Sequence, residues 1–213
     1  WTPNTTDAKG RRYRFGQQPQ MALWNLVQLA NAIYPLIETA EPLEAALEGY
    51  KNAYETQWLS MMRYKLGLAL PQDGDKELID NLLDSFRRIE TDMTIFFRQL
   101  AATDFSAANI NAVPETLQQA WYNSNPDPEA QAPLLQWLMH YQQRLQQETQ
   151  SASARKTAMD AVNPLYVLRN WLAQLAIDDI TETGSSTKLQ ELMSVLKQPY
   201  TEQNGKAHLA AKR

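Results

Sequence analysis

The sequence predicts an all-α protein, and three observations lead to that fold class. Gly is scarce, at 7 of 213 residues, whereas Leu, Ala, Gln and Met, which favour helices, are abundant. Apolar residues recur at three- and four-residue steps along most of the chain, so we expect about eight helices in one domain. Proline, which suits the first helical turn because its missing N–H would be unbonded there, precedes such runs at Pro19, Pro42, Pro114, Pro133 and Pro164.

The N-terminal half is expected to hold an irregular segment, 1–18, followed by long helices. The first helix runs from Pro19 to Ile37 and is apolar over most of its circumference, which is typical of a central helix with neighbours on several sides. A second begins at Pro42 and ends near Gly67. A third has Asp75 as its N-cap and continues through Phe97.

The C-terminal half is expected to continue in the same way. A short helix follows Pro114, and the polar, proline-rich segment 123–133 leads to a helix through Leu145. The next helices span 154–162, 164–177 and 186–196, with Asn163 capping the second of them and Pro199 stopping the last. The helical domain would thus cover 19–200, and the polar tail, 201–213, should be frayed.

Charge and composition exclude several classes of function. The formal net charge of −4 argues against a general nucleic-acid binder, which carries a basic excess. Without cysteine, this sequence can form no disulfide, thiolate nucleophile or cysteine-ligated metal site. No apolar run approaches the length of a membrane span and no signal peptide opens the chain, so we expect no membrane association and a cytoplasmic location. The first residue is Trp1 within polar, loop-like sequence, which indicates a piece cut from a longer protein.

The residues most often used in catalysis form no evident site. His140 is expected at a surface or half-buried position of a helix, and His208 lies far along the chain. Two histidines without cysteine cannot make a zinc site without much carboxylate help. Three acidic residues, Glu77, Asp80 and Asp84, are spaced at three- and four-residue steps and could bind a metal. The better interpretation is a solvated helix face on which Asp84 pairs with Arg87 or Arg88. There is no Gly-rich phosphate loop.

A basic segment near the start is the strongest electrostatic feature. Arg11, Arg12 and Arg14 follow Lys9 and alternate with aromatic residues. Guanidinium groups grip phosphate oxygens in pairs, so these three arginines are candidates for phosphate or substrate contact. The alternative is a solvated loop that its aromatic residues anchor.

Two polar clusters stand inside apolar sequence. Arg169, Asn170 and Trp171 are expected in the middle of a buried helix, where the arginine must find a carboxylate or carbonyls because an unpaired buried charge is costly. We expect them to lock helices together by hydrogen bonds rather than to contact a ligand. Trp24 and Asn25 are interpreted in the same way.

Several segments resemble one known family. They are YRFGQQP (13–19), ALWNL (22–26), KLGL (65–68) and VNPLYVLRNWLAQ (162–174), with looser agreement in FRQL (97–100) and LLQWLMHYQQRL (134–145). Together these segments resemble the C-terminal part of the selenoprotein O (SelO) family, kinase-like proteins that transfer AMP from ATP to protein hydroxyls. The resemblance extends from Trp1 to about Tyr200. Where the family often has Asp-Tyr-Thr, this chain has Asp92-Met93-Thr94, a change that puts no activity in doubt.

The resemblance implies a division of labour. The residues that bind ATP and Mg²⁺ and catalyse transfer would precede Trp1, so no catalytic, cofactor-binding or metal-binding residue is assigned to this chain. Residues 1–18 would correspond to an activation segment, and the helices from Pro19 onward to the C-terminal lobe and helical extension of a kinase-like fold. The partners implied are protein substrates and the N-terminal kinase-like region of the same bacterial protein. The family's short tail with cysteine or selenocysteine has no counterpart here.

Two other functions stay open at this point. The chain is alternatively a non-catalytic helical interaction module that docks a partner through Arg11, Arg12 and Arg14. Nucleic-acid binding through the same loop is the weaker alternative, because no further basic stripe supports it. If a neighbouring lobe is missing, apolar surface near Trp1, Phe15 and Trp24 would be exposed and would favour self-association of the piece.

Overall fold

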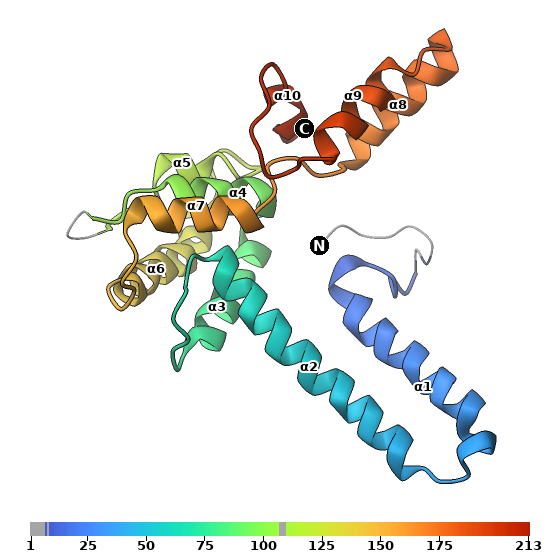
Figure 1. Ribbon diagram of the computed structural model, residues 1–213. Helices are drawn as coiled ribbons and strands as arrows, with labels where there is room; N and C mark the ends of the chain where they lie inside the picture. Colours follow the sequence, from blue (N-terminus) through green and yellow to red (C-terminus); the bar gives the residue numbers. More distant parts are fainter. Residues whose placement is uncertain (1–6, 8, 107–109) are drawn as a thin grey trace. The chain divides into compact units, whose positions relative to one another are not determined.

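The computed structural model describes residue 7, residues 9–106 and residues 110–213 (Figure 1). Within these residues all regular structure is helical apart from one isolated antiparallel bridge, Thr91 with Trp121, so the all-α prediction is confirmed. None of the described helices is both long and apolar enough to cross a membrane. The elements are η1 (Phe15–Gln17), α1 (Gln18–Ile37), α2 (Glu41–Lys65), α3 (Asp75–Arg88), α4 (Met93–Ala102), α5 (Glu115–Gln118), α6 (Pro128–Leu145), α7 (Ala152–Val162), α8 (Asn170–Thr183), α9 (Thr187–Leu196) and α10 (Ala207–Ala210).

The chain forms two compact units, Trp1–Ser60 and Met61–Arg213, and the boundary between them lies inside α2. In the first unit, the hydroxyl of Tyr50 on α2 donates a hydrogen bond to the carbonyl of Pro19 on α1 at 3.0 Å. None of the residues of α1 is buried, and Trp24 is 52% exposed. The prediction that this helix is surrounded is therefore wrong for these residues, because the described chain does not cover its apolar surface.

The core of the second unit lies among α3, α4, α6 and α7, with α3 packed on α6 and α4 on α7. Trp137 and Tyr141 of α6 stack with ring centroids 4.9 Å apart, and both are at most 2% exposed. Their polar atoms are satisfied by backbone carbonyls: the indole N–H of Trp137 donates to Leu78 at 2.7 Å, and the hydroxyl of Tyr141 to Leu66 at 2.6 Å. Two large aromatic side chains are thereby buried without an unpaired polar atom.

Helix α6 begins earlier than the sequence predicts. Its first residue is Pro128 rather than Pro133, and the carboxylate of Asp127 caps it by accepting the N–H of Glu129 at 2.8 Å. The pair Asp127–Pro128 supplies both a capping side chain and a proline in the first turn, which is sufficient to start the helix there. Pro133 lies inside the helix, where it forgoes one backbone hydrogen bond.

The expected third helix is two helices. α3 ends at Arg88, and α4 starts at Met93 after a short extended connection whose Thr91 pairs with Trp121. Asp92 caps α4, accepting the N–H of Ile95 at 3.0 Å, and this cap marks the break that apolar spacing alone conceals. At the other end, Asp75 is the first residue of α3 rather than its N-cap, which is Gly74.

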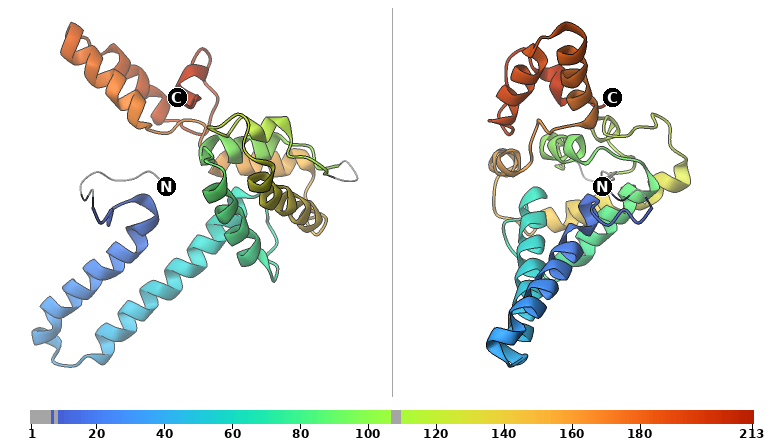
Figure 2. Two further views of the ribbon diagram at one scale, coloured as in Figure 1. Left: turned by 180° about the vertical axis from the view of Figure 1, so that it is seen from behind. Right: turned by 90° about the vertical axis from the view of Figure 1, so that its right-hand side faces the viewer.

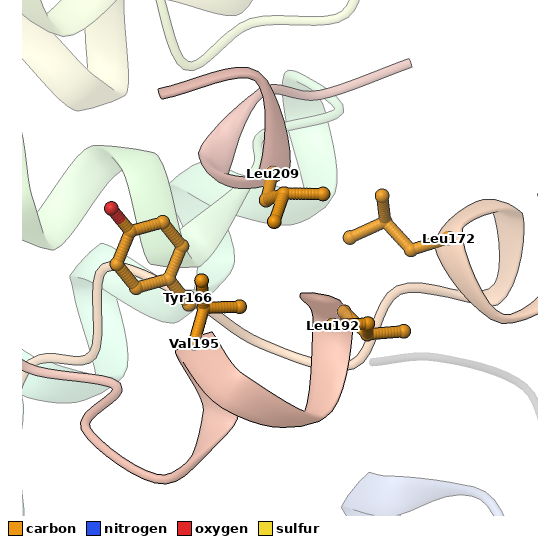
Figure 3. Close-up of a cluster of buried hydrophobic side chains, with 5 residues drawn as sticks. All are labelled: Tyr166, Leu172, Leu192, Val195 and Leu209. Carbon is orange, nitrogen blue, oxygen red and sulfur yellow. The ribbon is translucent and has the colours of Figure 1, made fainter. Parts of the chain in front are cut away.

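The C-terminal part of the second unit is a hairpin of α8 and α9 with a short helix against it (Figures 1 and 2). Their shared apolar cluster is shown in Figure 3: Tyr166, Leu172, Leu192, Val195 and Leu209. Leu209 belongs to α10, in the segment expected to fray. That expectation is wrong, because Leu209 is only 6% exposed and the segment folds back on the hairpin.

The exposed apolar surface of α1 leads to a prediction about self-association. Trp24, Leu29 and Leu36 are 52%, 56% and 84% exposed, and contiguous apolar surface favours association. We expect light scattering to show a mass that rises with concentration. The double variant Trp24→Ser/Leu29→Ser should reduce this rise, whereas Leu168→Ser, at an exposed position of the second unit, should not. A constant monomer mass at all concentrations would contradict this assignment.

Candidate functional site

The segment around Asn163 joins the end of α7 to the end of α2. Asn163 is 1% exposed and is the C-cap of α7, not the N-cap of a following helix as the sequence suggests. Its side chain donates to the carbonyl of Lys65 at 2.9 Å and accepts a hydrogen bond from the Lys65 ammonium at 3.1 Å. Burial lowers the pKa of Lys65, so this bond compensates part of the cost of desolvating its charge.

Gly67 lies next to this junction and has no room for a side chain. Its φ of +68° is in the left-handed region, and a Cβ atom would lie 2.6 Å from Arg155 and 2.8 Å from the Met159 sulfur. A larger residue would be strained in its backbone and would also clash with α7. The glycine of the KLGL segment is therefore explained by packing.

Residues 164–169 are not helical, and this corrects the predicted helix from Pro164 to Ile177. The residue before a proline is driven away from helical geometry, and Asn163 has φ −107° and ψ 108°. The next two N–H groups, of Leu165 and Tyr166, both donate to the carbonyl of Pro199, at 2.7 and 3.1 Å. These two bonds hold the segment against Pro199, which follows α9, and helix α8 begins only at Asn170.

Arg169 pairs with Asp92, and the pair connects the non-helical segment to the start of α4. Both guanidinium NH groups contact the carboxylate, one of them at 3.2 Å from Oδ1, and the side chains are 11% and 3% exposed. The hydroxyl of Tyr122 donates to the same carboxylate at 3.2 Å. Arg169 thus has the carboxylate that its burial requires, although it precedes a helix instead of lying in the middle of one.

The electrostatics of Asp92 follow from these bonds. Burial alone raises the pKa of this carboxyl group, but the hydrogen bond from Arg169 and the N–H of Ile95 outweigh it, and the net pKa lies below its usual value. The charged form is therefore favoured in the folded chain. The Asp92 anion therefore connects Arg169 to the N-terminus of α4.

The other predicted signature residues do not form buried hydrogen-bonded locks. Asn170 is exposed in the first turn of α8, and Trp171 is half-buried with an indole N–H that has no partner among the described residues. Trp24 and Asn25 are both exposed on α1. Asn170, Trp24 and Asn25 thus lie on exposed faces of their helices, whereas Trp171 packs against the apolar cluster around Tyr166.

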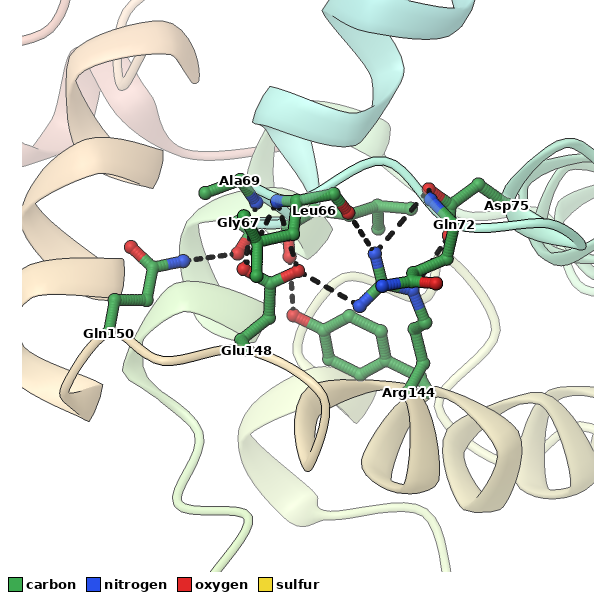
Figure 4. A network of polar contacts seen from close by, with 10 residues as sticks. Leu66, Gly67, Ala69, Gln72, Asp75, Arg144, Glu148 and Gln150 are labelled. Atoms are coloured by element: carbon green, nitrogen blue, oxygen red, sulfur yellow. Dashed lines mark hydrogen bonds and ion pairs between the residues drawn. The ribbon is translucent and has the colours of Figure 1, made fainter.

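A second buried ionic network, centred on Arg144 of α6, was not foreseen (Figure 4). Its guanidinium donates to Asp75 at 2.7 Å and to Glu148 at 2.9 Å, and all three side chains are at most 8% exposed. It also donates to the carbonyl of Leu70. Glu148 in turn accepts the N–H of Ala69 at 3.0 Å, so the network fixes the 66–70 loop against α6.

One sequence signal could have found this network. Trp137, Leu138 and Tyr141 define the buried face of α6, and Arg144 follows at the next three-residue step on that face. A charge at a core position requires a buried partner, and Glu148 lies one turn further on. Asp75 carries no such signal, because it is 69 residues away.

The basic loop is only partly free for a ligand. Of the expected irregular segment 1–18, residues 1–6 and 8, including Trp1, lie outside the described residues. Arg12 pairs with Asp7 at 2.7 Å, and this bond is the main reason that the pKa of Asp7 is lowered. Arg11, with φ +50°, and Arg14 are exposed and have no ion pair within the part of the chain that the structure describes.

The remaining candidates lie on the surface. His140 is exposed on α6, as predicted. Asp84 pairs with Arg87 at 2.5 Å, which confirms the predicted ion pair, and Asp80 pairs with Lys76 at 2.7 Å. The described residues contain no group of three or more His, Asp and Glu that could hold a metal ion.

These observations define an all-α protein in which Asp75, Asp92 and Glu148 are each paired with an arginine. Residues 1–197 match the model of the family described as "Protein adenylyltransferase SelO", and the chain belongs to this family. It is 45% identical over 224 residues to the protein nucleotidyltransferase YdiU of Rhodopirellula baltica, and 44% identical over 213 residues to that of Aromatoleum aromaticum. All of this chain is aligned in both comparisons, but it spans only 41% and 40% of the two relatives.

The Arg144 network leads to a stability prediction. Arg144→Met should lower the free energy of unfolding by about 3–5 kcal/mol, because Asp75 and Glu148 would remain buried without their cation. Urea unfolding measures this change. The control is Arg87→Met, which removes an ion pair whose side chains are 65% and 60% exposed and should change stability by no more than about 0.5 kcal/mol. Equal losses in the two variants would contradict the assigned role.

The Asp92 ion pair leads to a prediction about pH. Since the folded pKa of Asp92 is lowered, its contribution is complete above the unfolded pKa of about 3.9 and is lost as pH falls through the folded pKa. Asp92→Asn keeps a good N-cap residue but removes the charge, and should cost about 3–5 kcal/mol at neutral pH.

The measurement is urea unfolding of wild type and Asp92→Asn at a series of pH values. The difference in stability should shrink as the pH is lowered from about 5 to about 2, because the carboxyl group of Asp92 takes up a proton first in the unfolded chain and then, at lower pH, in the folded one. Asp84→Asn, at an exposed position on α3, serves as the control. A difference that stays constant over this range would show that the charge of Asp92 is not what stabilises the fold.

Proposed function

We propose that these 213 residues are the C-terminal helical part of a SelO-type protein adenylyltransferase, an enzyme that transfers AMP from ATP to Ser, Thr or Tyr hydroxyls of proteins. The observation that carries the proposal is the alignment of the whole chain with only 41% of a relative named as a protein nucleotidyltransferase. In this proposal the chain is scaffold and does not catalyse transfer. Its helices would form the C-terminal lobe and extension of a kinase-like fold.

The arrangement of the buried charges supports a structural role. The carboxylates of Asp75, Asp92 and Glu148 are each bound by a buried arginine. A metal ion or a triphosphate could use these groups only if the ion pairs broke, and unpaired buried charges are costly. We therefore propose that ATP and Mg²⁺ bind residues outside this chain, and that the whole protein acts in the bacterial cytoplasm.

The surface of the first unit supports the proposed partner. Trp24 and other apolar residues of α1 are exposed, and exposed apolar surface of this kind marks an interaction site. We assign this surface to the N-terminal kinase-like region of the same protein. Arg11 and Arg14, exposed beside it in sequence and without ion pairs among the described residues, would contact phosphate or the protein substrate.

The scaffold role is tested by a transfer assay. The 213-residue chain, incubated with tagged ATP, Mg²⁺ and a test protein, should give no labelled product, because in this proposal the residues that hold ATP and Mg²⁺ and catalyse transfer lie outside the chain. The whole protein should label the test protein under the same conditions. Labelling by the chain alone would contradict the scaffold role, and a whole protein that transfers no nucleotide would contradict the proposed activity.

The whole protein also allows the basic loop to be tested. Arg11→Ala and Arg14→Ala should each reduce labelling about tenfold, since a hydrogen bond to a charged group contributes about 1.5–3 kcal/mol. Lys51→Ala, which removes an exposed cation of α2, is the matched control. If the arginine variants label as well as this control, the loop is only a solvated connection.

A further inference from the structure

The segment from Pro199 onward returns to the non-helical connection that precedes α8. The Pro199 carbonyl accepts the N–H groups of Leu165 and Tyr166. Four residues later, the N–H of Gln203 donates to the hydroxyl of Tyr166 at 3.1 Å, and its side-chain amide donates to the carbonyl of Val195 at 3.1 Å. The backbone N–H and the side-chain hydroxyl of Tyr166 are therefore both hydrogen-bonded to the returning segment that begins at Pro199.

The middle of this segment is fixed to the α8–α9 hairpin by apolar contacts of Leu209 and Ala210 and by contacts of Lys206 and His208 with Glu191. Leu209 closes the cluster formed by Tyr166, Leu172, Leu192 and Val195 (Figure 3). Lys206 pairs with Glu191 of α9 at 2.5 Å, and the two side chains are 33% and 28% exposed. Leu209 is thus the only large apolar anchor between 201 and 212.

The end of the segment reaches the body formed by α3 to α7. The ammonium of Lys212 donates to the carbonyl of Trp121, which follows α5, and lies 5.8 Å from the centre of the Tyr122 ring. The segment consequently connects two parts of the second unit, the α8–α9 hairpin and the α3–α7 body, that the 163–169 connection also joins.

This connection is short and incompletely packed. Helix α10 has 4 residues, too few to be stable alone. A cavity of about 500 Å³ separates α10 from α4; it is lined by Thr94, Ile95, Arg98 and Gln99 on one side and by Ala207, Ala210 and Ala211 on the other. Segments with few apolar contacts open at a small fraction of the global unfolding free energy.

We infer that residues 201–212 form a latch that opens without unfolding the rest of the chain. In its closed state, the latch holds the α8–α9 hairpin against the α3–α7 body and covers the apolar side chains of Tyr166, Leu172, Leu192 and Val195. In its open state, the hairpin is held only through the 163–169 connection, and these apolar side chains are exposed. The latch is a conformational device of the scaffold and does not depend on the proposed transfer activity.

Hydrogen exchange measured on the whole chain tests the latch. In wild type, the amides of Gln203 and Leu209 should exchange about tenfold or more faster than those of α3 and α6, because they open locally. Leu209→Ser should accelerate exchange in 165–172 and 188–196 by about tenfold or more and leave α3 and α6 unchanged. Met193→Ser, at a position of α9 that is 52% exposed, should leave all these rates unchanged.

A second variant keeps the test decisive if Leu209→Ser does not fold. Lys206→Gln removes the ion pair with Glu191 and should accelerate exchange in 188–196 about two- to fivefold, whereas Lys197→Gln, an exposed lysine of the same hairpin, should not. Loss of protection that is equal in α3, α6 and the hairpin would show that the segment is part of the cooperative core. Unchanged exchange rates in both Leu209→Ser and Lys206→Gln would show that residues 201–212 do not stabilise the hairpin. Either result overturns the inference.

Discussion

The carboxylate of Asp92 is the connection on which the arrangement of the second unit depends. It caps the N-terminus of α4 after the break that follows α3, accepts a hydrogen bond from the hydroxyl of Tyr122, and forms an ion pair with Arg169. One side chain therefore fixes three segments, and two of them are 30 and 77 residues away in sequence. Apolar packing could hold the same segments together, but it would not specify which atoms meet.

The choice of ionic groups for these positions has a physical consequence. A buried ion pair gains little over well-packed apolar residues, yet removing one partner is severely destabilising. The Asp92 and Arg144 networks both combine an arginine with carboxylates that also accept backbone N–H groups. Separating the segments that either network joins would leave buried charges unpaired, so each network destabilises structures in which those segments are apart. They explain how a chain with scarce glycine and mostly local helical structure still has defined long-range contacts.

The sequence predicts much of the helical structure because the relevant forces are local. The helices at 18–37, 41–65, 152–162 and 187–196 follow from apolar periodicity, from proline in the first turn or from capping side chains, and they appear within about two residues of the predicted ends. The start of α6 was placed too late because Pro133 was taken as the first-turn proline, although Asp127 and Pro128 carry the stronger local signal.

The candidate site was less predictable because its determinants are distant in sequence. Residues 164–169 have a helical pattern, but they contact residues distant in sequence, Pro199 and Asp92, and they form a non-helical connection. Arg169 was correctly expected to need a carboxylate, whereas nothing local identifies Asp92 as that carboxylate. Asn25 and Asn170 were expected to be buried, and their actual exposure depends on which face of each helix finds a neighbour.

The 163–169 connection and the returning segment 201–212 are held in physically different ways, and this difference determines how firmly each is attached. The 163–169 connection is fixed at one end by the buried amide of Asn163 and at the other by the ion pair of Arg169 with Asp92, so detaching it would leave Asp92 buried without its cation. The returning segment is fixed mainly by one leucine, a partly exposed lysine and a few backbone bonds. Because the 163–169 connection persists when residues 201–212 detach, the α8–α9 hairpin can become more mobile and still remain attached to the α3–α7 body. If buried ion pairs fixed both the 163–169 connection and residues 201–212, the hairpin would be more rigid. If only apolar contacts fixed them, no directed interaction would define the point about which the hairpin moves.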